Sequence, residues 1–381
     1  MSKKDNSNKE RELNEIIIVG EIKIERGNLT EKIINSYENV NKEEPKQLWE
    51  LEDIKPIKNE EEIKDCEIFI NDNKIEFNYD YNFQKEGNYK IKYKFKKLMI
   101  STNFLFYGCN SITSLDLSNF NTQNVKSMGH MFQYCYSLMS LDLSNLNTQN
   151  VTNMMEMFWG CESLISLNLS NFNTQNVINM RNIFRDCSSL ISLNLSNFNT
   201  QYIIDMGNMF DGCNSLLSLD LIIFNTQHVI NMHYMFNDCK LLKSLDLSNF
   251  NTQNVSNMRN MFSDCSSLLS LDLSNFNTQK VIDMGFMFNN CNSLISLDLS
   301  NFNTQKAYDM GNMFSNCNSL LSLDLSNFNT QHVNYMDGMF DGCNSLLSLN
   351  LSNFNTQHVE IMRNMFDGCN SLILKYFKKF Y

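Results

Sequence analysis

The chain has 381 residues, 43% of them hydrophobic, which is enough to build a buried core and too much for a largely disordered chain. Residues 1–98 carry 19 basic and 22 acidic side chains, whereas residues 104–373 carry 9 basic and 20 acidic ones. Because this excess of carboxylates repels phosphate backbones, we do not expect nucleic acid as a partner.

The sequence contains no apolar stretch as long as a transmembrane helix. Its polar start has no apolar signal core before Glu12, and the run Ile16–Val19 is too short to be one. We therefore expect neither a membrane span, nor an ordinary export signal, nor an anchor. A cytoplasmic location, a removed leader and an unconventional export route stay open.

The N-terminal part is predicted to be a disordered tail, residues 1–12, followed by a small β-rich module, residues 13–98. Ile16–Ile24 predicts a strand, and the segments 68–70 and 75–77 predict a hairpin. In residues 89–95 apolar and lysine side chains alternate, which predicts a strand with one face in the core. Residues 42–64 are charge-rich and contain both prolines, so we expect a long loop. The module either caps the following repeats or binds a partner of its own.

Residues 99–373 contain a 26-residue repeat. Its unit is C-x-S-L-x-S-L-D-L-S-N-F-N-T-Q-x-V-x-x-M-x-x-M-F-x-x, and ten copies run without a gap from Cys109 to Gly368. In the first half, as in Leu141 and Leu143, leucines alternate with polar residues, which predicts a short strand. In the second half apolar residues recur every three or four positions, which predicts an inward stripe on a short helix or 3₁₀ coil.

One unit cannot bury both of its apolar faces, so successive copies must stack. The predicted fold is therefore an α/β repeat solenoid of the leucine-rich-repeat kind. It has a parallel sheet of short strands, joined by short helices or 3₁₀ coils, and the β-rich module precedes it. Ten strands at about 4.8 Å spacing would extend for about 50 Å.

The segments S-L-x-S-L-D-L-S-N-F-N-T-Q and M-x-x-M-F-x-x-C resemble the BspA-like leucine-rich repeats. They are also similar to the 26-residue repeat of bacterial and protist surface proteins, including mycoplasma lipoproteins. The resemblance covers nearly three quarters of the chain. It implies protein binding or adhesion, typically at a cell surface, although the leader and anchor usual in secreted members are not found here.

Eleven of the twelve cysteines recur every 26 residues, from Cys109 to Cys369. Their place in the repeat predicts buried free thiols that fill the core, with oxidation of a neighbouring pair as the alternative. Most of the 23 methionines occupy two repeat columns, for which core packing is the main expectation and a methionine-rich groove the alternative. No spacing indicates a zinc site, and no cofactor is expected.

An aspartate column alternates with the inward leucines and so points away from the core. We expect its side chains to bond the backbone or serines at the strand end, and a divalent-cation stripe is the alternative. Two histidines on adjacent coils, His332 and His358, offer a weaker metal hypothesis. The aspartates of the column are Asp116, Asp142, Asp220, Asp246, Asp272, Asp298 and Asp324.

The repeat is broken near its middle, where Ile222 and Ile223 replace a serine and an asparagine. Lys243 enters a mostly aliphatic column, where we expect its stem to lie along the core and its ammonium to reach water. Together with His228, these residues are the candidate partner-contact patch, unless the copy has merely drifted.

We therefore predict a non-catalytic repeat protein that binds another protein or a cell-surface component through an extended acidic surface. A residue repeated ten times is a poor catalyst, because catalysis needs one unlike constellation. The alternative function is a structural or self-assembling rod, with a cation as a stabilising option. Residues 374–381 form a short basic and aromatic tail that could cap the last coil.

Overall fold

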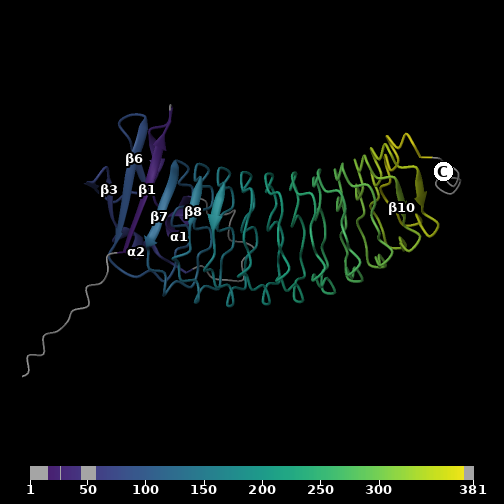
Figure 1. Ribbon diagram of the computed structural model, residues 1–381, viewed down its shortest axis with the longest axis horizontal. Coiled ribbons are helices and arrows are strands. Elements are labelled where there is room, and N and C mark those ends of the chain that lie inside the picture. The colour runs from purple at the N-terminus through teal and green to yellow at the C-terminus, as the bar shows by residue number, and fades with distance from the viewer. Residues whose placement is uncertain (1–15, 26, 44–56, 373–381) are drawn as a thin grey trace, which may run out of the picture.

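The computed structural model describes residues 16–25, 27–43 and 57–372. Figure 1 shows an elongated molecule, with the N-terminal module at one end and successive coils of chain side by side along one axis. The predicted tails, residues 1–12 and 374–381, lie outside the described residues. Neither of the two described helices is long or apolar enough to cross a bilayer.

The N-terminal module is built on a sheet that continues into the coils. In that sheet the strand order is β4-β3-β6-β1-β7-β8-β9, and β1 is antiparallel both to β6 and to β7, the first strand of the coils. Its strands are β1 (Ile16–Ile24), β3 (Glu67–Ile70), β4 (Asn73–Ile75), β6 (Gly87–Phe95), β7 (Ile112–Asn119), β8 (Ser140–Asp142) and β9 (Ser166–Asn168). The elements beside it are β2 (Thr30–Lys32), α1 (Tyr37–Glu43), α2 (Glu60–Lys64) and β5 (Asp80–Asn82).

The sequence-based expectations for this module are largely confirmed. The first strand has the predicted bounds, and β3 and β4 form a hairpin around Asn71 and Asp72, which both have positive φ. The hairpin is as predicted, but its second strand is Asn73–Ile75 and not residues 75–77, because the turn needs only the two left-handed residues. In β6, Ile91, Tyr93 and Phe95 are buried. The prediction of a loop over residues 42–64 is wrong at residues 42–43, which end helix α1, and at residues 60–64, which form helix α2. Its residues 44–56 lie outside the described residues.

Equivalent residues of neighbouring coils lie side by side. Ser140 pairs with Ser166 and Leu141 with Leu167, in parallel. The same pairing joins β10 (Ser322–Asp324) to β11 (Ser348–Asn350). A second line of parallel bridges, also at 26-residue spacing, runs through the other side of the coils, as between Asn231 and Asn257. The coils therefore stack in register, and parallel strands are regular only near the two ends of the stack.

The core lies inside the coils and is continuous with the core of the module. The predicted inward residues are buried in both halves of the repeat, as Leu143, Met154 and Cys161 illustrate. Phenylalanines stack from coil to coil, and the rings of Phe132 and Phe158 lie 5.7 Å apart and nearly parallel. Methionines of the two repeat columns, such as Met154 and Met157, are buried, so the expectation that they pack in the core is confirmed.

The predicted helix or 3₁₀ coil in the second half of the repeat is wrong. In these segments one backbone N–H bonds within its own turn, and the next bonds to the neighbouring coil. Met157 N–H donates to the carbonyl oxygen of Met154, and Phe158 N–H donates to the carbonyl oxygen of Ile183. Two residues per coil have positive φ, as Asn182 (57°) and Asp186 (55°) do. Because half of the amides bond outside their own coil, the segment is a chain of turns, and its left-handed positions are mostly Asn, Asp or Gly.

Candidate functional site

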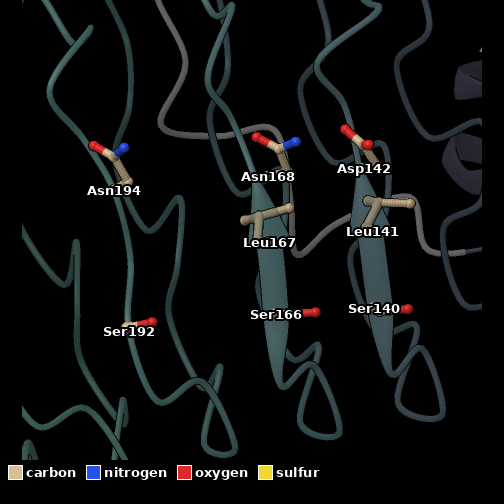
Figure 2. A pocket seen from close by; sticks show the side chains of 8 residues that line it. All are labelled: Ser140, Leu141, Asp142, Ser166, Leu167, Asn168, Ser192 and Asn194. Atoms are coloured by element: carbon tan, nitrogen blue, oxygen red, sulfur yellow. The ribbon is translucent and has the colours of Figure 1, made fainter.

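The outward face of the strands carries three exposed columns of side chains. Along each coil these are an aliphatic residue, a serine and an aspartate or asparagine, as in Ile295, Ser296 and Asp298, while Leu297 points inward. Figure 2 shows Ser140, Ser166 and Ser192 in one row along the stack, with Asp142, Asn168 and Asn194 in a second row. These rows line a shallow hollow of about 320 Å³. The small serines therefore form a trough beside the polar row.

The aspartate column is held by local hydrogen bonds. Asp272 Oδ1 accepts the backbone N–H of Ser274 at 2.9 Å, and Asn194 accepts the N–H of Ser196 in the same way. Hydrogen bonds from the backbone and hydroxyl of Ser274 lower the pKa of Asp272, while Asp246 and Asp298 act in the opposite direction. The expected bonding at the strand end is confirmed. The described residues contain no group of three or more His, Cys, Asp or Glu side chains placed to hold a metal ion.

The aliphatic column is exposed along the whole stack, and we call it the aliphatic ladder. Neighbouring members of the ladder are joined by backbone hydrogen bonds. Ile165 N–H donates to the carbonyl oxygen of Met139, and Leu347 N–H donates to that of Leu321. Each side chain is 46–54% exposed. The members are Met139, Ile165, Ile191, Leu217, Leu269, Ile295, Leu321 and Leu347.

At the N-terminal end the ladder enters a second hollow, of about 650 Å³. The segment from Lys23 to Glu31 contributes one side of it, and Tyr136, Met139 and Ile165 contribute the other. The exposed ladder is therefore flanked at this end by the N-terminal module.

The four predicted contact residues are all exposed, and they lie at two ends of a coil. Ile222 and Ile223 lie in the turn that follows the buried Leu221, and His228 lies in the next turn. Lys243 occupies the ladder position of the following coil. Leu217, beside Lys243 in the ladder, precedes Ile222 by five extended residues, or roughly 16 Å. The expectation that the column of Lys243 lines the core is wrong. In the equivalent segment Leu138–Leu141, the two leucines are buried, and Met139 and Ser140 between them are both exposed to solvent.

Ile223 also interrupts a hydrogen-bond column. In the next coil the side-chain amide of Asn249 donates to the carbonyls of Leu221, Ile222 and Phe224, at 2.8–3.1 Å. Asn275, one coil further, repeats the same three bonds. An isoleucine has no side-chain amide, so the carbonyls of the coil before Ile223 do not receive the three equivalent hydrogen bonds from residue 223.

The cysteines are free, as predicted. All twelve are unbridged, and only Cys369 is partly exposed. From Cys135 onward each repeat thiol donates to a phenylalanine carbonyl 29 residues earlier, as Cys161 does to Phe132 at 3.1 Å. Burial raises the pKa of these thiols, to about 12 for Cys265. They are core groups with little nucleophilic character at neutral pH.

One non-repeated cluster was missed by the sequence reasoning. Trp159 Nε1 donates to Asp186 at 3.0 Å, and the guanidinium of Arg185 lies 4.9 Å from the centre of the Trp159 ring. Arg185 Nε lies 3.2 Å from Asp211 Oδ2. Burial raises the pKa of Asp211 to about 6, against the lowering effects of Asn237 and Arg185. The available signal was Trp159 itself, one of only two tryptophans in the chain.

Several solved structures resemble this chain weakly. A leucine-rich cell surface protein from Faecalibacterium prausnitzii is 15% identical, with a TM-score of 0.32, over 67% of this chain and 76% of that one. The TLR13–ssRNA13 complex is 18% identical, with a TM-score of 0.20, over 71% of this chain and 46% of that one. The Drosophila Toll–Spatzle complex is 15% identical, with a TM-score of 0.25, over 60% of this chain and 36% of that one. This chain thus spans less than half of each of the latter two.

No curated protein matches the chain. A family of repeat proteins, in contrast, matches residues 100–218, 179–296 and 269–378, which together are well over half of the sequence. The chain belongs to the family described as "Mycoplasma protein of unknown function, DUF285".

Proposed function

We propose that this protein is a non-catalytic binding protein that holds another protein on the outward face of its strands. The observation that carries the proposal is the aliphatic ladder, a line of eight half-exposed apolar side chains that Lys243 interrupts once, beside a row of aspartates and asparagines. Scattered exposed apolar residues are ordinary, but a contiguous apolar line rimmed by polar groups is typical of interaction sites.

A test compares two variants of the full chain in a capture experiment with extract of the source cells. The first replaces Ile191, Leu217, Leu269 and Ile295 by serine. The matched control replaces four exposed residues of a different column, Ile178, Ile204, Ile230 and Ile282, which are 47–55% exposed. We expect a specific partner to be lost with the ladder variant and kept with the control. Equal capture by both variants would contradict the proposal.

We further propose that the N-terminal module caps the stack. The support is the hydrogen bonding of β1 to β7, because the first coil of a stack otherwise presents an open edge. Replacing Gly20, which faces Leu115 across this pairing, by valine tests it. A Cβ at Gly20 would lie 2.6 Å from the Ser114 carbonyl oxygen. We expect the variant to expose the first coil to proteolysis, while Glu21→Val, at the adjacent exposed position of β1, serves as a surface control.

Surface display and the BspA-like type of repeat are also proposals, and they are supported by the sequence resemblance. Protease treatment of intact source cells tests display: a surface protein is cleaved while a cytoplasmic marker stays whole. The alternative role, a self-assembling rod, predicts that the purified chain forms oligomers in light scattering that the ladder variant does not form.

A further inference from the structure

Lys243 divides the aliphatic ladder into two segments of four residues. Met139, Ile165, Ile191 and Leu217 precede it and form segment A, and Leu269, Ile295, Leu321 and Leu347 follow it and form segment B. The two segments are equally exposed, so they offer similar apolar area to a partner.

The two segments differ in charge. Segment B is accompanied by Asp272, Asp298 and Asp324, and the row continues with Asp246 in the coil of Lys243, while Asn350 lies beside Leu347 at the far end. Beside segment A, Asp142 and Asp220 are separated by asparagines at positions 168 and 194. Within the described part of the chain, none of the four carboxylates from Asp246 to Asp324 forms an ion pair. Hydrogen bonds from the following serines lower the pKa of all four. The row is therefore ionised at neutral pH and has no cation of its own.

The spacing of the ladder selects the shape of a partner. Neighbouring coils are about 4.8 Å apart, so the four residues of segment B extend for roughly 14 Å. A helix places one apolar residue per turn of about 5.4 Å, so that three turns extend for roughly 16 Å. An extended strand places side chains on one face only every ~6.8 Å, and three such steps overshoot the segment by more than one coil.

The width of the face fits the same partner. Within a coil, Asp298 follows Ile295 by three extended residues, or roughly 10 Å, and the small Ser296 lies between them. This width is close to the 10–12 Å diameter of a helix with its side chains. A helix lying over the serines can contact the ladder on one side and reach the carboxylates with Lys or Arg on the other.

We propose that segment B docks a basic amphipathic α-helix of a partner protein, with the helix axis along the stack. The apolar stripe of the helix lies on Leu269, Ile295, Leu321 and Leu347, and its basic side chains lie over Asp246, Asp272, Asp298 and Asp324. Lys243 repels the basic helix and ends the site. This inference rests on the proposed function and specifies the chemistry of the partner.

The test uses a labelled synthetic helical peptide with one leucine stripe and flanking lysines, titrated with the full chain by fluorescence anisotropy. We expect saturable binding that weakens as salt rises. Replacing Asp246, Asp272 and Asp298 by asparagine should weaken binding at least tenfold. Asparagine already occupies this column at positions 168, 194 and 350 with the same backbone bond, so the variant keeps the fold.

Matched variants separate the two segments. Replacing Leu269, Ile295 and Leu321 by serine should abolish binding, while replacing Ile165, Ile191 and Leu217 by serine should leave it within about twofold. Circular dichroism and the melting temperature verify that each variant is folded. A peptide with glutamate in place of lysine should not bind. Equal losses in the two segments, or equal binding of the glutamate peptide, would overturn the inference.

The same peptide distinguishes this inference from the proposed function. If a cellular partner is captured through the ladder and the lysine peptide does not compete with it, the helix inference is wrong and protein binding stands. If capture is independent of the ladder, both are wrong.

Discussion

The guanidinium of Arg259 reaches across an entire coil to Asp309, with 2.6 Å between Nη1 and Oδ2, although 50 residues separate the two. The coil between them contributes Gly285, and a Cβ there would lie 2.8 Å from Nη1 of Arg259 and 3.1 Å from Oδ2 of Asp309. The absence of a side chain at position 285 thus opens the path for an ion pair that ties three coils together.

Replacing Gly285 by alanine should break this tie. Alanine by itself reduces the entropy of the unfolded chain and stabilises by about 0.4–1 kcal/mol, so the effect must be isolated in a double-mutant cycle with Arg259→Ala. Because Arg259 and Asp309 are partly exposed, we expect a coupling free energy of about 0.5–1 kcal/mol from urea unfolding. Gly129→Ala, where a Cβ meets no atom closer than 3.1 Å and which lies far along the stack from Arg259, should show no coupling. Zero coupling at Gly285 would mean that the ion pair contributes nothing.

Ile223→Asn should stabilise the protein. It restores the side-chain amide that the equivalent residues Asn249 and Asn275 use to bond three carbonyls of the preceding coil. The gain in the free energy of unfolding should be about 1 kcal/mol. The reciprocal change, Asn275→Ile, should lower stability by a similar amount. If Ile223→Asn also weakens capture of a partner, the isoleucine contributes to binding, and unchanged capture would mean that it reflects drift.

Asp272 separates the roles of charge and hydrogen bonding. Asp272→Asn retains an acceptor for the Ser274 N–H and removes repulsion from Asp246 and Asp298, so stability at pH 7 should be kept or rise at low salt. Asp272→Ala leaves the N–H without this acceptor and should destabilise. Because the pKa of Asp272 is lowered by folding, its ionised form stabilises above its unfolded pKa, and this is lost as pH falls through the folded value. Urea titrations at pH 7 and pH 3 measure both effects, and equal behaviour of the two variants would contradict this account.

Asp211 has the opposite linkage to pH. Burial raises its pKa to about 6, above the ordinary value near 4, so between these values the folded state holds a proton that the unfolded state releases. The stability contributed by protonated Asp211 is complete below about pH 4 and is lost as pH rises through 6. The stability of Asp211→Asn relative to the wild type should therefore rise between pH 4 and pH 7. A difference that does not change with pH would show that Asp211 stays ionised beside Arg185.

Cys369 should be the first repeat thiol to react. It is partly exposed, and burial raises its pKa only to about 11, whereas the thiols inside the stack are fully buried. Alkylation with iodoacetamide at pH 8, followed by mass spectrometry of peptides, should label Cys369 before Cys343 and the earlier members. All twelve should react in guanidinium chloride. Cys369→Ser should remove the early label, and early labelling of Cys187 or Cys213 would indicate that the stack opens.

The inward-facing residues of each unit could be predicted from the repeat pattern alone. Leucines at a spacing of two, and methionine, phenylalanine and cysteine at spacings of three and four, can be buried together only if equivalent coils stack, because one unit is too small to enclose them. The same reasoning predicted the free thiols, and β1 and the hairpin β3–β4 followed from local alternation and turn residues. These features are predictable because each depends on residues that lie close together in the sequence or recur at a fixed spacing.

The hydrogen bonding of the second half of the unit, and the identity of the column presented to solvent, depend on the contacts between coils and were not predictable from the pattern. A spacing of three fits a helix and a chain of turns equally well, and the two differ in whether an amide bonds within its own coil or to the next one. Met139 and its equivalents are aliphatic, and they face water because two successive residues, Met139 and Ser140, turn outward where the strand begins. The tie from Arg259 to Asp309, and the pairing of β1 with β7, join segments that are 50 or more residues apart. No local sequence pattern indicates which of these distant residues will meet, because the stacking of the coils brings them together in space.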